Sequence, residues 1–232
     1  MSALPGRLRE ARLAIAGVEA VLGPEGALWL PGERALLVAD LHFEKGSAQL
    51  ARGYVVPPYD TAATLDALER AVARHDPARL VSLGDAFHDV AGPTRLIPRD
   101  RERLVALTTG RDLVWITGNH DPVIAGDLPG ERAAELRLGP LMLRHEPSPG
   151  AAPGEIAGHL HPAAVLRGGP RTVRRKCLAS DGARAVLPAF GTYAGGLDLA
   201  NPALRRLFDP RALVAYMLSD GQVFPVAGRR CL

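Results

Sequence analysis

Short apolar segments that end in metal-binding side chains constrain the fold of this chain more than any other feature. The clearest is 80–88, where an apolar run stops at Gly84 and then reaches the carboxylate of Asp85. Such a run predicts a buried strand of a parallel sheet. Because parallel sheets bind their ligands beyond the carboxyl ends of the strands, we expect Asp85 to face a functional site.

Four other segments share this pattern of apolar residues followed by acid, amide or imidazole groups. They are 35–42, 112–121, 141–145 and 155–161. Six of the seven histidines of the chain lie in these five segments. Carboxylates and imidazoles that converge from strand ends would be poorly paired without cations, so we interpret them as metal ligands. The candidate ligands are Asp40, His42, Asp85, Asn119, His145, His159 and His161.

Oxygen and imidazole nitrogen suit divalent ions such as Mn, Fe or Zn and disfavour a soft thiolate site. Seven ligands are too many for one ion, so we expect two ions with Asp85 as the bridge. The expected sets, one for each ion, are Asp40, His42 and His161, and Asn119, His145 and His159. Two ions about 3.5–4 Å apart polarise a phosphoryl group and acidify a bridging water, which becomes the nucleophile.

His120 follows a candidate ligand directly, so its side chain points away from the ions and toward a substrate. We expect it to donate a proton to the departing oxygen, with Asp121 or His88 orienting it. Lys45 and Arg52 are candidate phosphate-binding residues, although a solvated surface role fits them equally well.

Length and composition set broad limits on the protein. A chain of 232 residues can bury one large core, so we expect a single domain over residues 1–232. The formal net charge of +3 indicates no particular partner. Cys177 and Cys231 are two scattered thiols, as in many cytosolic proteins. The first residues show neither a signal-peptide pattern nor a membrane span, so we expect a cytoplasmic protein with no membrane contact.

The order of elements predicts an α/β fold. A helix over 62–75, capped by Asp60 or Thr61, connects the first two central strands, and a helix opened by Pro98 connects the next pair. Strands that alternate with helices form parallel sheets with right-handed crossovers. Residues 8–14 fit a short helix, and 17–30 fit a β-hairpin at one edge of the sheet.

After Asp121 the segments are short and lack long helices between them, which predicts a second, mixed or antiparallel sheet. Asp181-Gly182 and Asp220-Gly221 are each flanked by β-type runs and predict two hairpins. We therefore expect two sheets face to face with helices outside. The basic run Arg171, Arg174, Arg175 and Lys176 could follow a nucleic-acid backbone or could be the solvated face of an edge strand.

The motifs together resemble the calcineurin-like metallophosphoesterase superfamily. The motifs that carry this resemblance are Asp40-Leu-His42, Gly84-Asp85, Gly118-Asn-His-Asp121, His145 and Gly158-His-Leu-His161. The resemblance implies a four-layer α-β-β-α sandwich of two mixed sheets and the same division of ligands between two ions. Phosphoprotein phosphatases of this group carry Asp three residues after the bridging acid. Here His88 takes that position, as in the branch that resembles double-strand-break repair nucleases, which favours phosphodiester substrates.

More narrowly, five segments look like the bacterial ligase-associated DNA-damage-response endonuclease family. They are 39–46, 51–53, 144–147, 158–162 and 187–196. This resemblance implies a Mn-dependent DNA endonuclease and phosphodiesterase, associated genetically with an ATP-dependent DNA ligase, a helicase and an exonuclease. No role for Glu44 follows from the sequence.

The leading hypothesis is a two-metal phosphodiesterase that cuts DNA in a repair pathway and binds DNA weakly through its phosphates. One alternative keeps the catalyst and changes the substrate to a small molecule, which makes the protein a nucleotide phosphodiesterase or phosphatase. The other alternative is a non-catalytic interaction module stabilised by metal.

Overall fold

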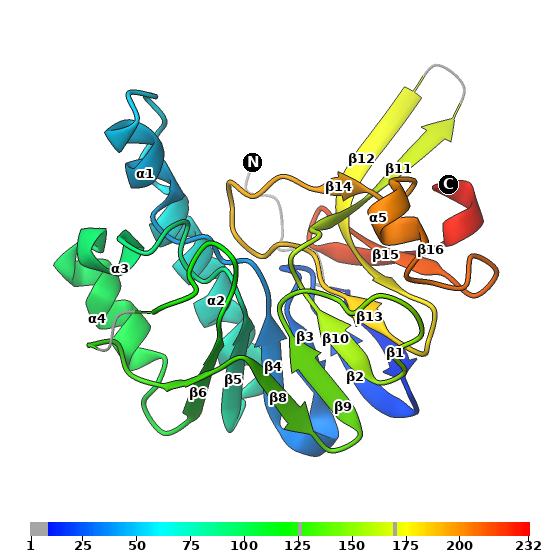
Figure 1. Ribbon diagram of the computed structural model, residues 1–232, viewed down its shortest axis with the longest axis horizontal. Helices are drawn as coiled ribbons and strands as arrows, with labels where there is room; N and C mark the ends of the chain where they lie inside the picture. Colours follow the sequence, from blue (N-terminus) through cyan, green and yellow to red (C-terminus); the bar gives the residue numbers. More distant parts are fainter. Residues whose placement is uncertain (1–8, 125–126, 169–170) are drawn as a thin grey trace, which may run out of the picture.

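The strands form two mixed sheets. The structure, a computed structural model, describes residues 9–124, 127–168 and 171–232. Within these ranges the first sheet has seven strands in the order β1 to β7 (Figure 1). Their bounds are β1 (Ala11–Ile15), β2 (Val18–Leu22), β3 (Leu28–Leu30), β4 (Ala35–Val38), β5 (Arg79–Leu83), β6 (Asp112–Ile116) and β7 (Glu131–Ala133).

Strands β4, β5, β6 and β7 run parallel, as the order of elements predicted. Leu37 of β4 pairs with Val81 of β5, and Val81 pairs with Val114 of β6. This register brings the carboxyl ends of β4 and β5 to one edge of the sheet, so the loops that begin at Ala39 and Gly84 start side by side.

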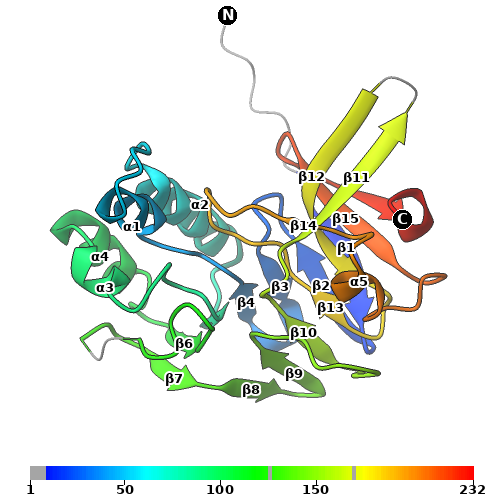
Figure 2. The same cartoon turned by 45° about the horizontal axis from the view of Figure 1, so that its top comes forward.

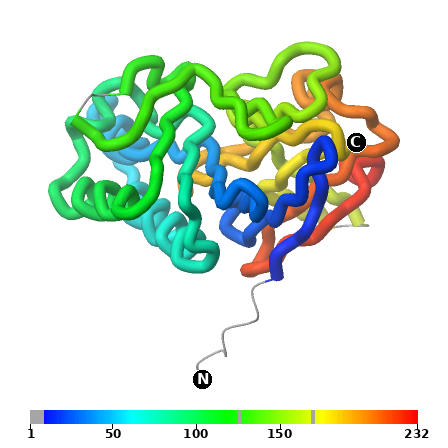
Figure 3. The backbone as a smooth tube through the Cα atoms, turned by 90° about the horizontal axis from the view of Figure 1, so that it is seen from below, coloured from blue at the N-terminus to red at the C-terminus, as the bar shows by residue number. Residues whose placement is uncertain are grey.

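The amino-terminal edge differs from the prediction. Strands β2 and β3 form the expected antiparallel hairpin. Of the predicted helix 8–14, residue 8 lies outside the described residues, and residues 9–14 do not form a helix. Instead β1 adds to β2, with Leu13 paired to Ala20. The buried and exposed residues of β1 alternate, which is the period of a strand rather than of a helix. Arg9 also bridges to Gln222, so the start of the chain lies along β16 (Figure 3).

The second sheet is mixed. In the described residues its strands follow the order β14-β11-β12-β13-β10-β9-β8, with β15 paired to β12 and β16 paired to β15. Both predicted Asp-Gly hairpins are present as the antiparallel pairs β12/β13 and β15/β16. The bounds are β8 (Glu135–Leu138), β9 (Leu141–Arg144), β10 (Glu155–Ala157), β11 (Pro162–Gly168), β12 (Arg171–Ser180), β13 (Ala185–Val186), β14 (Leu197–Asp198), β15 (Val214–Ser219) and β16 (Gln222–Ala227).

Helices cover the outer faces of both sheets, which gives the predicted four layers (Figure 2). The first sheet carries the longer helices, and the outer layer of the second sheet is thin, with one short helix among the described residues. The helices are α1 (Lys45–Ala51), α2 (Asp60–His75), α3 (Gly92–Arg95), α4 (Pro98–Ala106) and α5 (Pro202–Arg205). None of these helices has both the length and the apolar composition that a membrane crossing requires.

The core divides according to the faces of the first sheet. Leu37 faces the second sheet and belongs to a cluster with Ile156 and Leu178. The neighbouring Leu36 faces the helices and belongs to a cluster with Leu68, because successive side chains of a strand point to opposite faces. Apolar packing on both faces holds the strands rigidly, and therefore also the loops at their carboxyl ends.

The two tryptophans and His75, the histidine outside the five segments, have structural roles. Trp115 is buried and donates from Nε1 to the carbonyl of Pro129 at 2.9 Å. His75 lies at the end of α2, stacks on Trp29 with ring centroids 5.2 Å apart, and approaches Glu10 at 3.2 Å.

A buried ion pair joins Arg184 to Glu155 of β10 inside the second sheet. Arg184 is 2% exposed and Glu155 is 3% exposed. The same guanidinium donates to the carbonyls of Ser148 and Gly150 at 2.9 and 2.7 Å. It therefore ties the loop before β10 to the loop after β12.

Replacing Glu155 with glutamine is expected to lower the free energy of unfolding by about 3–5 kcal/mol, because it leaves the Arg184 charge buried without its counter-ion. Urea unfolding followed by circular dichroism measures this loss. Glu135→Gln is the control, since Glu135 is half exposed in its pair with Arg144 and is expected to contribute at most about 1 kcal/mol. Equal losses in the two variants would contradict this account of the pair.

Candidate metal centre

The predicted ligands come together where the two sheets meet. Asp40, Asp85 and Asn119 follow the parallel strands β4, β5 and β6. His145 follows β9, and His159 is close behind β10, which runs parallel to β9. All five loops therefore leave the carboxyl ends of parallel strands, where such sheets bind ligands.

The first predicted set is close-packed. His42 Nε2 lies 3.3 Å from His161 Nε2, and His161 Nε2 lies 3.2 Å from Asp40 Oδ1. These three residues form one group whose possible ligand atoms lie within 4.8 Å of one another.

The second predicted set has the same spacing. His145 Nε2 lies 2.9 Å from Asn119 Oδ1 and 3.1 Å from His159 Nδ1. Asp85 lies between the sets, with Oδ1 3.5 Å from His145 Nε2 and Oδ2 4.0 Å from His42 Nε2. Each oxygen of Asp85 thus faces a different set, which is the arrangement that a bridging carboxylate requires.

These distances fit divalent metal ions. Two ligand atoms about 2.1 Å from one ion, at angles of 90–109°, lie about 3.0–3.4 Å apart. The nitrogen–nitrogen distances of 3.3 and 3.1 Å match this separation. Two imidazole nitrogens that face each other otherwise share at most one proton, so a cation explains both contacts better than a hydrogen bond does.

Two of the ligand histidines, His42 and His159, favour the neutral form that metal binding needs. Burial lowers the pKa of His42 to about 2, with further contributions from the neighbouring His161 and His120. Burial also lowers the pKa of His159. His145 donates from Nδ1 to the carbonyl of Leu83 at 2.9 Å, which fixes its ring so that Nε2 faces Asp85.

The ligand loops have an unusual backbone. Six residues that are not glycine have positive φ in these loops, a conformation that costs about 1–3 kcal/mol for each residue. They are Asp40, His42, Glu44, Asp85, His159 and His161. The rigid strands before the loops hold this strain, and the left-handed turns aim the side chains at one point.

Gly118 allows Asp85 to approach the strand end of β6. A Cβ atom at position 118 would lie 2.1 Å from Asp85 Oδ1 and 2.3 Å from Asp85 N. No side chain fits this space, so the glycine of the Gly118-Asn119 motif is needed for the position of the bridge.

Gly118→Ala is therefore expected to displace Asp85 and to lower hydrolysis about a hundredfold, since a displacement of about 1 Å costs that much in a catalytic site. Gly195→Ala is the control, because a Cβ there meets no atom within 4 Å. Hydrolysis of a chromogenic phosphodiester and metal content per chain measure the effect. Full activity of Gly118→Ala would show that the position of Asp85 is not critical.

His120 lies beside the ligands on the open side of the site. Its side chain is 39% exposed, and Nε2 lies 4.0 Å from Asp85 Oδ2. Its Nδ1 lies 2.9 Å from the backbone carbonyl of His88, and the two rings stack with centroids 5.2 Å apart. His88 thus orients His120 through both its carbonyl and its ring.

The predicted role of Asp121 in orienting His120 is wrong. Asp121 accepts from the backbone amides of Phe87 and Gly118, each at 3.0 Å. It is buried, and burial raises its pKa to about 6. Asp121 therefore joins the loops after β5 and β6 and supports the position of Asp85 instead.

A third cluster was missed by sequence reasoning. His42, His88 and His120 also bring possible ligand atoms within 4.8 Å of one another. Burial lowers the pKa of His88, with further contributions from Lys45, His120 and Arg52. His88 Nδ1 is buried without a hydrogen-bond partner in the described residues. His88 was expected beside His120 from the sequence, but neither of them was joined to His42 as a group of possible ligands.

Lys45 and Arg52 lie near this cluster, as their effect on the His88 pKa indicates. Lys45 begins α1 and Arg52 follows the end of that helix. Both residues therefore add positive charge near His88.

Glu44 points away from this region. Its carboxylate accepts from Thr61 Oγ1 at 2.9 Å and from Ser47 Oγ at 2.6 Å. Neither Asp60 nor Thr61 caps α2 as predicted. Thr61 accepts from Glu44 N, and Asp60 accepts from Gly46 N, so both residues anchor the start of α1. Glu44 is therefore part of the support for α1 and does not repel an anionic substrate.

Lys176 of β12 is a further residue of the site region. It donates from Nζ to the carbonyls of Ala189 and Gly191 at 2.9 and 2.7 Å, and burial lowers its pKa to about 8. Gly191 N in turn donates to the Asp40 carbonyl at 3.1 Å. Lys176 thus supports the loop beneath Asp40. The sequence offered one signal for this role, which is that Lys176 is one of only two lysines in the chain.

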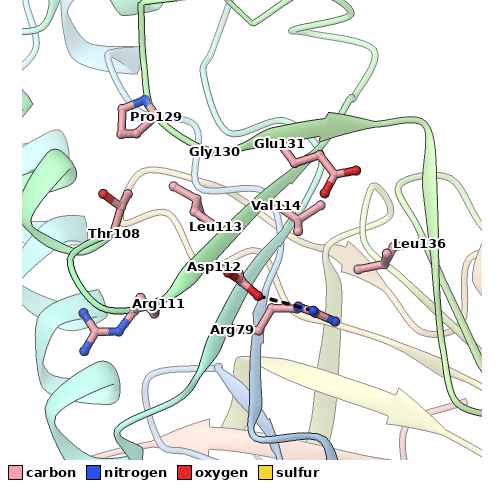
Figure 4. Close-up of a pocket in the computed structure, with 10 residues that line it drawn as sticks. All are labelled: Arg79, Thr108, Arg111, Asp112, Leu113, Val114, Pro129, Gly130, Glu131 and Leu136. Atoms are coloured by element: carbon pink, nitrogen blue, oxygen red, sulfur yellow. Dashed lines mark hydrogen bonds and ion pairs between the residues drawn. The ribbon is translucent and has the colours of Figure 1, made fainter.

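The hollows of the protein surface do not all lie at this site. A cavity of about 410 Å³ lies at the amino ends of β5 and β6, where Arg79 pairs with Asp112 (Figure 4). None of its lining residues is a candidate ligand. A hollow of about 320 Å³ includes Asn119 and His145 and opens beside the second ligand set.

Two mixed sheets with paired oxygen and nitrogen ligand sets at their shared edge define a metallophosphoesterase. In structure the chain is similar to the Pseudomonas putida nuclease MPE, with a TM-score of 0.73 and 32% sequence identity over 94% of this chain and 100% of that chain. The chain belongs to the metallophosphoesterase family.

The chain also matches the phosphoesterase Yfce from E. coli, with a TM-score of 0.40, 20% identity, and coverage of 83% of this chain and 98% of that one. No protein-family model matches the chain. No curated protein matches it in sequence.

Proposed function

We propose that this protein is a DNA endonuclease that hydrolyses phosphodiester bonds with two divalent metal ions. Mn²⁺ is the ion that the family resemblance implies, and Fe or Zn also suits oxygen and imidazole ligands. The observation that carries the proposal is the position of Asp85, whose two oxygens face the two ligand sets. The similar Pseudomonas putida protein is named a nuclease, which supports DNA as the substrate.

Two sets of residues would hold the ions, with Asp85 shared between them. They are Asp40, His42 and His161, and Asn119, His145 and His159. Bound ions supply Lewis acidity toward water and toward the phosphoryl oxygens.

Side chains of the site would supply proton donation and phosphate binding. His120 is open to solvent and oriented by His88, so it can give a proton to the departing sugar oxygen. Lys45 and Arg52 bring positive charge to the same side and would bind a flanking phosphate. His88 and His120 contribute rings rather than carboxylates here, so little negative charge opposes a polyanionic strand.

The proposal includes a cellular setting. The enzyme would act in the cytoplasm as part of DNA repair, in functional association with an ATP-dependent DNA ligase, a helicase and an exonuclease. Its contact with DNA would be weak and mediated by phosphates.

One assay tests the substrate. Purified protein would be incubated with supercoiled plasmid, single-stranded circular DNA, cyclic and linear nucleotides, and a chromogenic diester, with Mn²⁺, Mg²⁺, Zn²⁺ or no metal. The proposal expects metal-dependent cutting of DNA with little hydrolysis of nucleotides. Hydrolysis of nucleotides alone would favour a small-molecule phosphodiesterase, and no hydrolysis with any metal would favour a non-catalytic module.

A further inference from the structure

A basic hairpin projects from the second sheet beside the metal centre. Its outer part comprises 166–168 of β11 and 171–176 of β12, and is called here the basic arm. Beyond Cys177, β12 pairs with β13 and β15, whereas the arm residues of β12 pair with β11 alone. The arm stands clear of the body (Figures 1 and 2), and residues 171–175 are all exposed.

The arm concentrates the positive charge of the protein. Residues 162–180 contain five cations and no acid. Since the formal net charge of the chain is only +3, the rest of the chain is net negative. The five cations are Arg167, Arg171, Arg174, Arg175 and Lys176.

These cations differ in their partners from several of the other surface arginines. Arg12, Arg95 and Arg101, for example, each pair with a carboxylate. In the described part of the chain none of the arm cations forms an ion pair. Arg174 donates to the carbonyl of Gly196, and Arg175 donates to Ser219 Oγ at 3.1 Å. The charges of the arm are therefore not neutralised by neighbouring carboxylates.

Strand pairing divides the cations between two faces. Arg167 is opposite Thr172, and residues 172, 174 and 176 of β12 share one face. Arg167, Arg174 and Lys176 thus form one face, which we call the inner face. Arg171 and Arg175 lie on the other face.

The inner face leads to the first ligand set. Lys176 bonds the carbonyl of Gly191, whose amide donates to the Asp40 carbonyl. Arg174 bonds the carbonyl of Gly196, and the next residue, Leu197, donates to the His161 carbonyl at 2.8 Å. A line of positive charge therefore starts at the loops that carry Asp40 and His161 and continues outward along the arm.

We propose that the inner face of the basic arm binds the phosphates of the DNA strand that flank the bond to be cut. Residues two apart on a strand are about 6.6 Å apart, and diagonal neighbours across a pair are about 7–8 Å apart. Arg167 and Arg174 are diagonal neighbours across the strand pair. They therefore offer two adjacent positive charges to a polymer that carries one negative charge per nucleotide. This inference rests on the proposed function and specifies which side of the site the strand takes.

The two faces provide a matched test. Arg167→Gln with Arg174→Gln removes two charges from the inner face, and Arg171→Gln with Arg175→Gln removes two from the outer face. In each pair, one arginine donates a hydrogen bond to the body of the protein and the other lies near the tip of the arm. Anisotropy of a labelled 30-nucleotide single strand without metal, from 50 to 300 mM NaCl, measures binding. Cleavage of that strand and hydrolysis of a chromogenic diester with Mn²⁺ measure catalysis.

The inner pair is expected to weaken DNA binding about tenfold near 0.1 M salt and to flatten the slope of log affinity against log salt by about 1.4, or 0.7 for each lost phosphate contact. The outer pair is expected to change the DNA affinity and the salt slope by less than half as much as the inner pair does. Hydrolysis of the diester and the thermal midpoint should match wild type for both pairs.

Equal weakening by the two pairs, or no weakening by the inner pair, would overturn the role of the inner face while leaving the endonuclease proposal intact. If wild-type protein hydrolyses the diester but neither binds nor cuts DNA, the proposed substrate is wrong and the arm proposal falls with it. The two failures are thus distinguishable.

Discussion

Replacing Asp85 with asparagine is expected to lower hydrolysis of both DNA and a chromogenic diester by at least about a thousandfold. Removing one neutral hydrogen-bond donor from a charged transition state costs about 10²–10³-fold, and Asp85 is a charge that faces both ligand sets. Asparagine keeps the shape of the side chain but removes that charge. We also expect fewer than two bound metal ions per chain.

Asp112→Asn is the matched control for this variant. Asp112 begins β6 at the opposite edge of the same sheet, and its side chain is 73% exposed in its pair with Arg79. It should retain activity and metal content. A loss in Asp85→Asn no greater than in Asp112→Asn would contradict the bridging role.

Replacing His120 with glutamine is expected to lower DNA cleavage by about 10²–10⁴-fold, the usual contribution of a general acid. The sugar oxygen that leaves from DNA is a poor leaving group and needs a proton. Nitrophenolate is a good leaving group and needs no proton. The hydrolysis of bis-p-nitrophenyl phosphate should therefore fall much less in this variant than DNA cleavage does. The ratio of the two losses, measured as kcat with saturating Mn²⁺, reports on proton donation.

His75→Gln is the control for His120, since His75 lies at the end of α2 and stacks on Trp29. It should leave both activities unchanged. Losses of equal size on DNA and on the nitrophenyl diester would instead indicate that His120 positions the substrate or a metal ion.

The parallel strands could be predicted because their chemistry is local. The run before Gly84 is apolar except for Ser82 and is buried at every position after Arg79, and burial on both faces is what parallel strands require. The α2 stripe of Leu65, Leu68 and Val72 is likewise a local pattern, and all three residues are buried. β1 was misread because Leu8, Ala11 and Ile15 also have the i, i+3, i+7 spacing of a helix, and the segment is too short for either period to decide.

The ligand sets could be predicted because every member is a metal-binding residue placed just after a strand. What the sequence does not contain is the direction of each side chain in a left-handed loop. Glu44 has a φ of 63° and turns to Thr61 rather than to the site. Asp121 accepts a hydrogen bond from the amide of Phe87, which is distant in the chain. The role of Asp121 therefore cannot be assigned from sequence spacing alone.

The basic run could be read in two ways for the same reason. Alternation along β12 was visible in the sequence, but the partner of each residue on β11 was not. Only the pairing of Arg167 with Thr172 shows that Arg167 joins Arg174 on the face beside the metal loops.

The central claim is a pair of metal ions bridged by Asp85. Anomalous scattering from crystals grown with excess Mn²⁺, collected on both sides of the manganese absorption edge, tests it most directly. We predict two peaks about 3.5–4 Å apart, one beside Asp40, His42 and His161 and the other beside Asn119, His145 and His159. A single peak, or none, in well-loaded crystals would contradict the account.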